Sequence, residues 1–233
     1  MKKSFLMIVC LLVAITVSAQ TLEEIIKNYT VANRLDKISG FQTLKITGNM
    51  SVSGMDLPME IWMKNPNKIK TVTSFNGTEM VQSFDGEKGY TINPMTGSTD
   101  PTDMTPDQVK DLLRSNIFQN YMAEYLKNGQ LTLAGEDNVG GKPAFKINAK
   151  LENGSNATMY IDKSTWLLLK TTADVNNQGM TMTVESYPSD YQETNGVLLP
   201  MKTTSSASGM ELVTTFSKVE VNIPIQDSIF KLK

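Results

Sequence analysis

The sequence has no histidine and only one cysteine, Cys10, which lies near the N-terminus. The chain therefore lacks the side chains of Ser-His-Asp and Cys-His nucleophile systems and the usual zinc ligands. It also lacks G-x-S-x-G, P-loop and G-x-G-x-x-G motifs. Most classes of hydrolase and nucleotide-dependent enzyme are therefore not expected. We therefore expect no catalytic residue, no metal site and no cofactor.

The N-terminus has the features of a secretory signal peptide. Two lysines precede an apolar run from Phe5 to Val17, and the small residues of Val17-Ser18-Ala19 suit cleavage. The apolar run is shorter than the roughly 20 residues that cross a bilayer, so a retained membrane anchor is the weaker alternative. We expect residues 1–19 to be removed, residues 20–233 to form a single domain, and the protein to be periplasmic.

The charge of the mature chain is mildly acidic. Removal of the signal peptide takes away two lysines, which leaves 20 basic against 24 acidic residues and a formal net charge of −4. A domain without a basic cluster is poorly suited to hold nucleic-acid phosphates or anionic headgroups by charge alone. We expect no nucleic-acid partner, and binding by apolar burial remains open.

The spacing of apolar residues divides the first half of the chain into a helix and strands. Helical spacing from Leu22 to Ile38 follows a capping box of Thr21 and Glu24, and Gly40 is the expected stop. From residue 41 apolar and polar residues alternate with the period of a β-strand. Turn signals rich in glycine, proline and asparagine then predict five strands before residue 94.

A second helical segment interrupts the strands. Thr105 is its expected N-cap, Pro106 its first residue and Gly129 its stop, with a break near Ser115-Asn116. Beyond it, seven further strands are predicted between residues 130 and 221. The chain is therefore mainly β, with about eleven or twelve antiparallel strands in simple up-and-down order and two helical segments.

A meander of this length has to cover its apolar face. It curls with the twist of the sheet, and a barrel of about eleven strands is wider than its own side chains can fill. Helices or a ligand must occupy the space. The thirteen methionines of the mature chain suit an irregular cavity for acyl chains, although they also suit an ordinary core. Side-chain alternation predicts a cavity lined by Leu44, Ile46, Met50, Met59, Ile61, Met63, Phe75, Phe145 and Ile147. The lid is predicted to present Val109, Leu113, Phe118 and Met122.

Three short motifs follow one another between residues 35 and 94. Residues 35–41 read LDKISGF, residues 62–67 read WMKNPN, and Asp85-Gly86 is followed by Asn93-Pro94. In this order they resemble the helix-to-strand junction, the strand-end motif W-x-K-R-P-N and the D-G and N-P spacing of the periplasmic lipoprotein carriers LolA and LolB. Residues 223–230 also resemble the tail of exported relatives called outer-membrane lipoprotein-sorting proteins.

This resemblance implies a fold and a ligand. The fold would be an open antiparallel half-barrel of about eleven strands, with an N-terminal helix and a helical lid. The ligand would be the acyl chains of a lipoprotein, or a phospholipid, carried by a monomer that contacts an inner-membrane donor and an outer-membrane acceptor transiently. The family's latch arginine is replaced by Asn65, which has neither the charge nor the reach of arginine. A latch that works by the family's mechanism is therefore in doubt.

Two alternatives from other classes stay open. An envelope scaffold or partner-binding protein would have a barrel filled by its own side chains. A hydrolase would need two carboxylates facing each other across a polar cleft, of which the alternating pattern gives no sign. Asp85 is expected to stabilise a turn, and the acids Asp100, Asp103 and Asp107 lack the full calcium-binding pattern of an EF-hand.

Overall fold

The computed structural model describes residues 20–97, 99–118, 120–151, 155–177 and 180–232, so the proposed signal peptide, residues 1–19, lies outside the described residues. One antiparallel sheet of thirteen strands forms most of the molecule. Among the described residues, no helix combines the length and the apolar character that a membrane crossing requires. The mainly β, open half-barrel expected from the sequence is confirmed.

The sheet consists of two meanders. The first contains β1 (Thr43–Val52), β2 (Met55–Lys64), β3 (Lys68–Phe75), β4 (Thr78–Phe84), β5 (Gly89–Ile92) and β6 (Thr102–Asp103). The second contains β7 (Leu131–Val139), β8 (Lys142–Lys150), β9 (Asn156–Asp162), β10 (Leu168–Asn177), β11 (Met180–Thr194), β12 (Val197–Ala207) and β13 (Met210–Val221). The five strands expected before residue 94 and the seven expected after residue 129 are present, and the two-residue β6 is additional.

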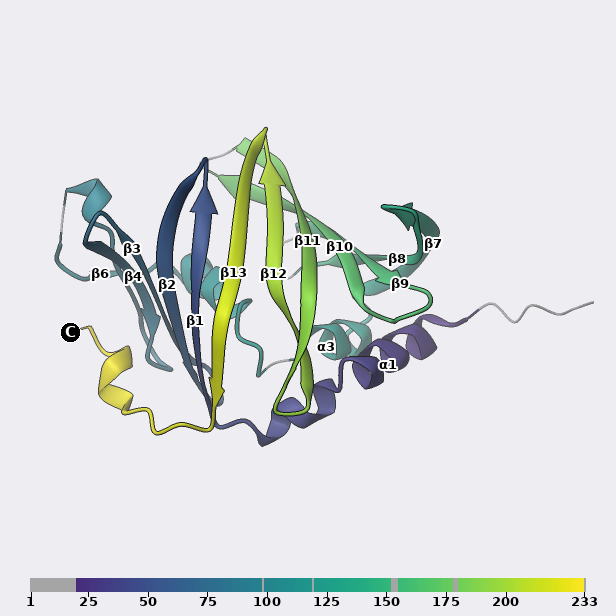
Figure 1. The fold of residues 1–233 in the computed structure, drawn as a ribbon, viewed down its shortest axis with the longest axis horizontal. Coiled ribbons are helices and arrows are strands. Elements are labelled where there is room, and N and C mark those ends of the chain that lie inside the picture. The colour runs from purple at the N-terminus through teal and green to yellow at the C-terminus, as the bar shows by residue number, and fades with distance from the viewer. Residues whose placement is uncertain (1–19, 98, 119, 152–154, 178–179, 233) are drawn as a thin grey trace, which may run out of the picture.

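The order of the strands differs from the simple meander that we expected. Strands that are consecutive in sequence are neighbours except for β6 and β7, which form the two edges of the sheet, and the meanders meet where β1 pairs with β13. The connection from β6 to β7 contains two helices, α2 (Pro106–Leu113) and α3 (Tyr121–Lys127). This connection crosses the concave side of the sheet, from β6 at one edge to β7 at the other (Figure 1).

The helices begin as expected, but the first one ends early. Thr21 and Glu24 form the predicted capping box of α1 (Leu22–Ala32), and Thr105 caps α2. The expectation that the first helix continues to Ile38 is wrong. The side chain of Asn33 is buried and donates hydrogen bonds to the carbonyls of Tyr29 and Trp166. This contact with a distant turn ends the helix, and a 3-10 helix, η1 (Leu35–Gly40), follows.

A bulge in β1 lets the two meanders join. The register between β1 and β13 shifts between Thr47 and Gly48. A Cβ atom at Gly48 would overlap the carbonyl oxygen of Thr215, so only glycine permits this close approach of the strands. The bulge bends β1 at the centre of the sheet, where curvature is needed to form the concave side.

The C-terminal segment covers part of the outer face of the sheet. After β13 it returns across the first meander and ends in a 3-10 helix, η3 (Asp227–Phe230), beside β3 (Figure 1). Phe230 is fully buried, and its carbonyl accepts a hydrogen bond of 2.8 Å from the hydroxyl of Ser83, which is also buried. Strands β3 and β4 are therefore covered on both faces near this end.

Candidate functional site

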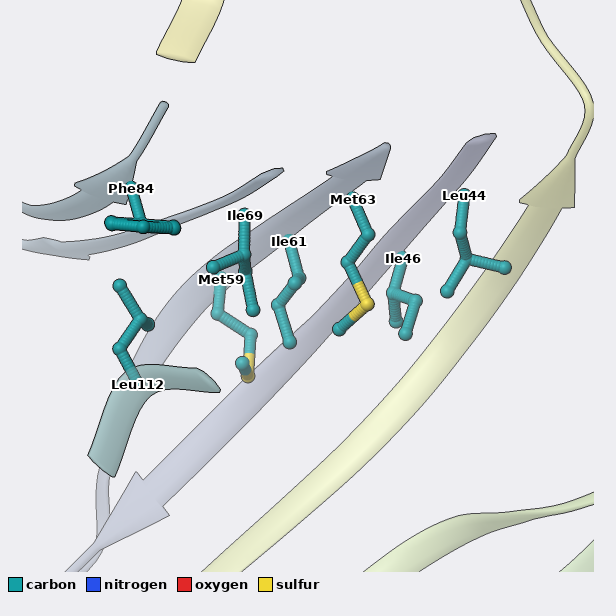
Figure 2. Packing of buried hydrophobic residues seen from close by; sticks show 8 residues of the cluster. All are labelled: Leu44, Ile46, Met59, Ile61, Met63, Ile69, Phe84 and Leu112. Carbon is teal, nitrogen blue, oxygen red and sulfur yellow. The ribbon is translucent and has the colours of Figure 1, made fainter. Parts of the chain in front are cut away.

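The concave side of the first meander carries a compact apolar cluster. In the register of β1 and β2, Leu44 lies opposite Met63 and Ile46 lies opposite Ile61. Alternation therefore places these side chains on one face. Figure 2 shows them on the same side of neighbouring strands, with Leu112 approaching from α2. The buried members of this cluster, which we call the lid cluster, are Leu44, Ile46, Met59, Ile61, Met63, Ile69, Phe84 and Leu112.

The segment that contains α2 lies over the lid cluster. Val109, Leu113 and Phe118, three of the four predicted lid residues, pack against it. The approach of α2 to the sheet is close at Gly89 in β5, where a Cβ atom would overlap a methyl group of Val109. The structure thus brings these lid residues together with Leu44, Ile46, Met59, Ile61 and Met63 of the predicted cavity wall.

A second apolar cluster fills the concave side of the second meander. Phe145 and Ile147 belong to it, and Met122 of α3 packs against it together with Tyr29 of α1. Phe145 also stacks on Trp166, with 5.6 Å between the ring centroids. Burial raises the pKa of Tyr29 to about 12. The residues that we predicted to line one cavity are therefore divided between two clusters, each covered by different helices.

Met50 and Phe75 occupy a different position from the other predicted residues. Met50 is partly buried and packs at the edge of the lid cluster, whereas Phe75 is partly buried near the end of β3 and belongs to neither of the two clusters. Here the concave side of the first meander extends beyond its helical cover.

Two pockets open beside the lid cluster. The larger, of about 530 Å³, lies between α2 and the strands at the edge of the first meander. Its lining residues are Phe84, Glu87, Lys88, Gly89, Asp103, Met104, Pro106, Val109 and Lys110. The smaller, of about 240 Å³, lies on the concave face next to Met50. The volume of the larger pocket falls within the roughly 300–1,000 Å³ of small-molecule sites.

The buried and turn carboxylates are held by local hydrogen bonds. Asp85 accepts hydrogen bonds from the backbone of Glu87 and Lys88, as expected of a turn residue. Burial works against the charged form of Asp162, but hydrogen bonds from Ser164 and Thr165 outweigh it and hold the pKa of that carboxyl below its ordinary value. Within the described ranges, no group of three or more histidine, cysteine, aspartate or glutamate residues could hold a metal ion.

Three solved structures resemble this arrangement. A DUF1329 family protein from Desulfovibrio piger aligns with a TM-score of 0.59 and 16% identity, over 89% of this chain and 97% of the other. A putative outer membrane lipoprotein-sorting protein domain from Vibrio parahaemolyticus gives 0.57 and 11%, over 89% and 94%. A LolA superfamily protein from Nitrosomonas europaea gives 0.58 and 12%, over 91% and 98%. The chain has a LolA-like fold.

The side chains of this LolA-like fold have to be interpreted on their own. No protein-family model and no curated protein matches the sequence. At 11% to 16% identity the three solved structures share little sequence with the chain, so the likeness describes the path of the backbone. The chemistry of the concave side follows from the residues present here.

Asn65, which we expected at the position of a latch arginine, makes its side-chain contact within the start of the sheet. The side-chain amide of Asn65 donates a hydrogen bond of 3.2 Å to the carbonyl of Phe41, at the start of the sheet. The lid is fastened by Asn116 instead, a buried residue between α2 and α3 whose amide donates to the carbonyl of Pro66 at 3.1 Å. Sequence reasoning marked Asn116 only as a helix break.

Proposed function

We propose that the chain is a periplasmic carrier that holds the acyl chains of a lipoprotein, or of another lipid, against its concave face and moves them towards the outer membrane without catalysis. One observation carries the proposal. The apolar face of an open sheet is covered by short helices, and a pocket of about 530 Å³ lies between α2 and the sheet. An apolar ligand can take the place of the helical side chains that now cover this face.

The energetics favour such an exchange. Each methylene group withdrawn from water contributes about 0.8 kcal/mol, so a long acyl chain needs a covered apolar surface to cross an aqueous compartment. The side chains of Val109, Leu113 and Phe118 occupy that surface at present. When α2 moves away, the acyl chain replaces their contacts with the lid cluster, and the apolar surface stays covered throughout.

The fold likeness supports the same function. Two of the similar structures are described as an outer membrane lipoprotein-sorting protein domain and a LolA superfamily protein. The N-terminal sequence of this chain agrees with export, because its charged, apolar and small-residue regions follow one another in the order of a signal peptide. A carrier in the periplasm would meet both membranes of the envelope.

The test is native mass spectrometry of residues 20–233 with lipid extraction, after expression with export to a bacterial periplasm. We expect copurified acylated lipid in the wild-type protein and its loss in Met50→Glu, because Met50 borders both the smaller pocket and the lid cluster. The matched control is Asn49→Glu, which places the same charge one residue away on the opposite face of β1. A wild-type protein that emerges empty and ignores added acyl chains contradicts the proposal.

A scaffold function has one observation in its favour. Both apolar clusters are filled by side chains of the chain's own helices, as expected of a self-filled half-barrel. The same experiment separates the two functions. A scaffold stays lipid-free and is unaffected by Met50→Glu, whereas a carrier loses its lipid.

A further inference from the structure

Three neighbouring β-hairpins end at the same side of the sheet, away from α1 (Figure 1). Their turns join β1 to β2, β3 to β4 and β12 to β13, and these six strands are consecutive in the sheet. Both central residues of each turn have a positive φ, as in the two-residue type I′ turn. The turn residues are Ser53-Gly54, Asn76-Gly77 and Ser208-Gly209. The three hairpin tips are therefore short and have one shared geometry.

An apolar residue lies beside each of these turns, on the concave side of the sheet. Met55 is 49% exposed and Met210 is 60% exposed, while Phe75 is partly buried. Each lies an even number of residues from a residue of its own strand that belongs to the lid cluster or packs against it, so alternation places both on one face. Those residues are Met59, Ile69 and Phe216. The apolar face of the sheet therefore continues to the hairpin tips, where the helices no longer cover it.

An acidic residue follows on the outer face of each hairpin. Asp56, Glu79 and Glu211 are exposed, and they alternate with the concave residues of β2, β4 and β13. Within the part of the chain that the structure describes, no carboxylate of these three forms an ion pair or a hydrogen bond. We call the six residues the hairpin rim: Met55, Phe75 and Met210 on its inner side, and Asp56, Glu79 and Glu211 on its outer side.

Basic residues are missing from the hairpin rim. None occurs in residues 51–57, 74–80 or 206–212. On these six strands the lysines nearest to the rim are Lys70 and Lys202, each five residues from the end of its strand. At about 3.3 Å per residue they are roughly 17 Å away along the sheet. The charge of the rim is therefore purely acidic.

The apolar residues of the hairpin rim form a group and not a set of isolated side chains. Single exposed apolar residues are ordinary on protein surfaces, whereas grouped ones mark interaction sites. Strands β3, β2, β1 and β13 are consecutive, so Phe75, Met55 and Met210 lie within about 15 Å of one another across the sheet. That length matches about three turns of an α-helix. The type I′ turns hold the group in place, so little ordering opposes its binding to a partner.

The acidic outer side of the hairpin rim decides between possible partners. An anionic lipid surface would be repelled by Asp56, Glu79 and Glu211, and so would the rim of a second copy of this chain. A protein segment with an apolar strip flanked by lysine or arginine complements both sides of the rim. Its apolar side chains would cover Met55 and Met210, while its cations would lie beside the carboxylates.

We propose that the hairpin rim is a docking surface for a partner protein that presents a cationic amphipathic segment of about three helical turns. The inference goes beyond the proposed function, because it requires no lipid on the concave face. Burial of the rim's methionines supplies affinity, and the carboxylates supply the preference for cations and speed the encounter.

The experiment uses two synthetic helical peptides with the same leucine face, one with lysines and the other with glutamates on the opposite face. Fluorescence anisotropy measures their binding to residues 20–233. We expect the wild-type protein to bind the lysine peptide about tenfold more tightly than the glutamate peptide, and added salt to reduce this preference. In the triple variant Asp56→Lys, Glu79→Lys and Glu211→Lys the preference reverses. In the double variant Met55→Ser and Met210→Ser the affinity for the lysine peptide falls about tenfold while its preference over the glutamate peptide persists.

The matched control changes the net charge by the same amount elsewhere. Glu23, Asp36 and Glu124 are exposed and lie in α1, η1 and α3, so their replacement by lysine should leave the wild-type preference for the lysine peptide intact. A reversal in this variant too would mean that net charge alone selects the peptide, which overturns the assignment to the rim.

Three further outcomes overturn the proposal. The wild-type protein binds neither peptide, or it binds both with equal affinity, or the triple rim variant keeps the wild-type preference. Sedimentation with vesicles of phosphatidylcholine and phosphatidylglycerol tests the membrane directly. Binding to these vesicles that is lost in the double serine variant would assign the rim to a lipid surface and overturn the assignment to a protein partner.

Discussion

The side-chain amide of Asn116 donates a hydrogen bond to the backbone carbonyl of Pro66, in the turn between β2 and β3. Asn116 is 1% exposed, and its side-chain oxygen accepts a second hydrogen bond of 3.0 Å from the backbone of Phe118. A residue of the lid segment thus holds that segment to the sheet. The side-chain amide of Asn65, at the strand end, donates instead to the carbonyl of Phe41.

The first prediction concerns this link. Asn116→Ala leaves the carbonyl of Pro66 and the amide of Phe118 without these partners. Both hydrogen bonds are only partly buried, so the expected cost is about 1 kcal/mol, at the lower end of the range for buried groups. We expect faster amide hydrogen exchange across residues 106–127 and little change in the second meander. Exchange measured by mass spectrometry checks this.

Asn65→Ala is the matched control for the lid. It removes the same type of side chain from a contact with Phe41, so exchange in residues 106–127 should stay at the wild-type rate. Equal acceleration in both variants would show that the lid is not held by Asn116 in particular.

The second prediction concerns the close approach of α2 to β5. A Cβ atom at Gly89 would overlap Val109 and lie 3.1 Å from the Cβ atom of Met104. Gly89→Ala should therefore destabilise the protein by about 1–3 kcal/mol, the usual cost of overpacking. Val109→Ala removes the methyl groups in the way, so the double variant should lose less stability than the sum of the two single variants.

Urea denaturation of the four proteins gives this coupling free energy. A value near zero would mean that the backbone of α2 moves away without resistance from Val109. Gly54→Ala cannot serve as a control because Gly54 has a positive φ of 80°, and Gly40→Ala, where nothing lies within 4 Å, serves better. Gly40→Ala should leave the contact between α2 and the sheet intact.

The register of β1 and β2 explains how far alternation in the sequence can group side chains on one face. β1 and β2 are regular, so the positions of Ile46, Ile61 and Met63 on one face follow from a period of two. Trp62, which alternates with Met63, lies on the other face, where the Nζ atom of Lys45 of β1 is 5.1 Å from the centroid of its ring. Local sequence is sufficient where a strand is covered on one face only.

Contacts between distant segments limited the prediction elsewhere. Val72 and Val81 are buried although they lie on the outer face, where the C-terminal segment returns to the sheet. This is why the apolar pattern of β3 does not alternate cleanly. Likewise, α1 ends at Asn33 because of a hydrogen bond to Trp166, 133 residues away. Neither contact leaves a signal in the neighbouring sequence.

Thr71 and Thr73, which line the smaller pocket, were not among the predicted cavity residues, for another reason. Threonine is common on the wet face of a strand, so Thr71 and Thr73 look like outward residues when the sequence is read alone. Thr71 and Thr73 follow Ile69 by two and four residues, so alternation places them on the same face as Ile69. This spacing indicates a pocket only when it is also known which part of the concave face the helices leave uncovered.

The third prediction concerns the C-terminal segment. Phe230 is fully buried on the outer face, and Phe230→Ala should cost about 3–5 kcal/mol, as expected for removal of a large buried side chain. Lys231→Ala, an exposed neighbour, should change stability by less than about 0.5 kcal/mol. Thermal and urea denaturation measure both. Similar small effects for the two variants would mean that the segment contributes little to the sheet.

The fourth prediction is a pH dependence at the same segment. Hydrogen bonds from Lys64 and Lys68 lower the pKa of Asp227 to about 2, from an ordinary value of 3.8. Because the folded pKa is depressed, the stabilisation is present above the ordinary value and is lost as the pH falls through about 2. Asp227→Asn lacks it at every pH.

The urea midpoints of the wild-type protein and of Asp227→Asn should therefore differ at neutral pH and converge as the pH falls from 3.8 towards about 2. The effect is small because Asp227 is exposed and solvent screens the two ion pairs. Asp56→Asn removes an exposed carboxylate at the start of β2, far along the strand from Lys64, and should reproduce neither the difference nor the convergence. A gap between the midpoints that persists in acid would mean that the substituted amide disturbs the packing of the segment, because a purely electrostatic contribution disappears once Asp227 is protonated.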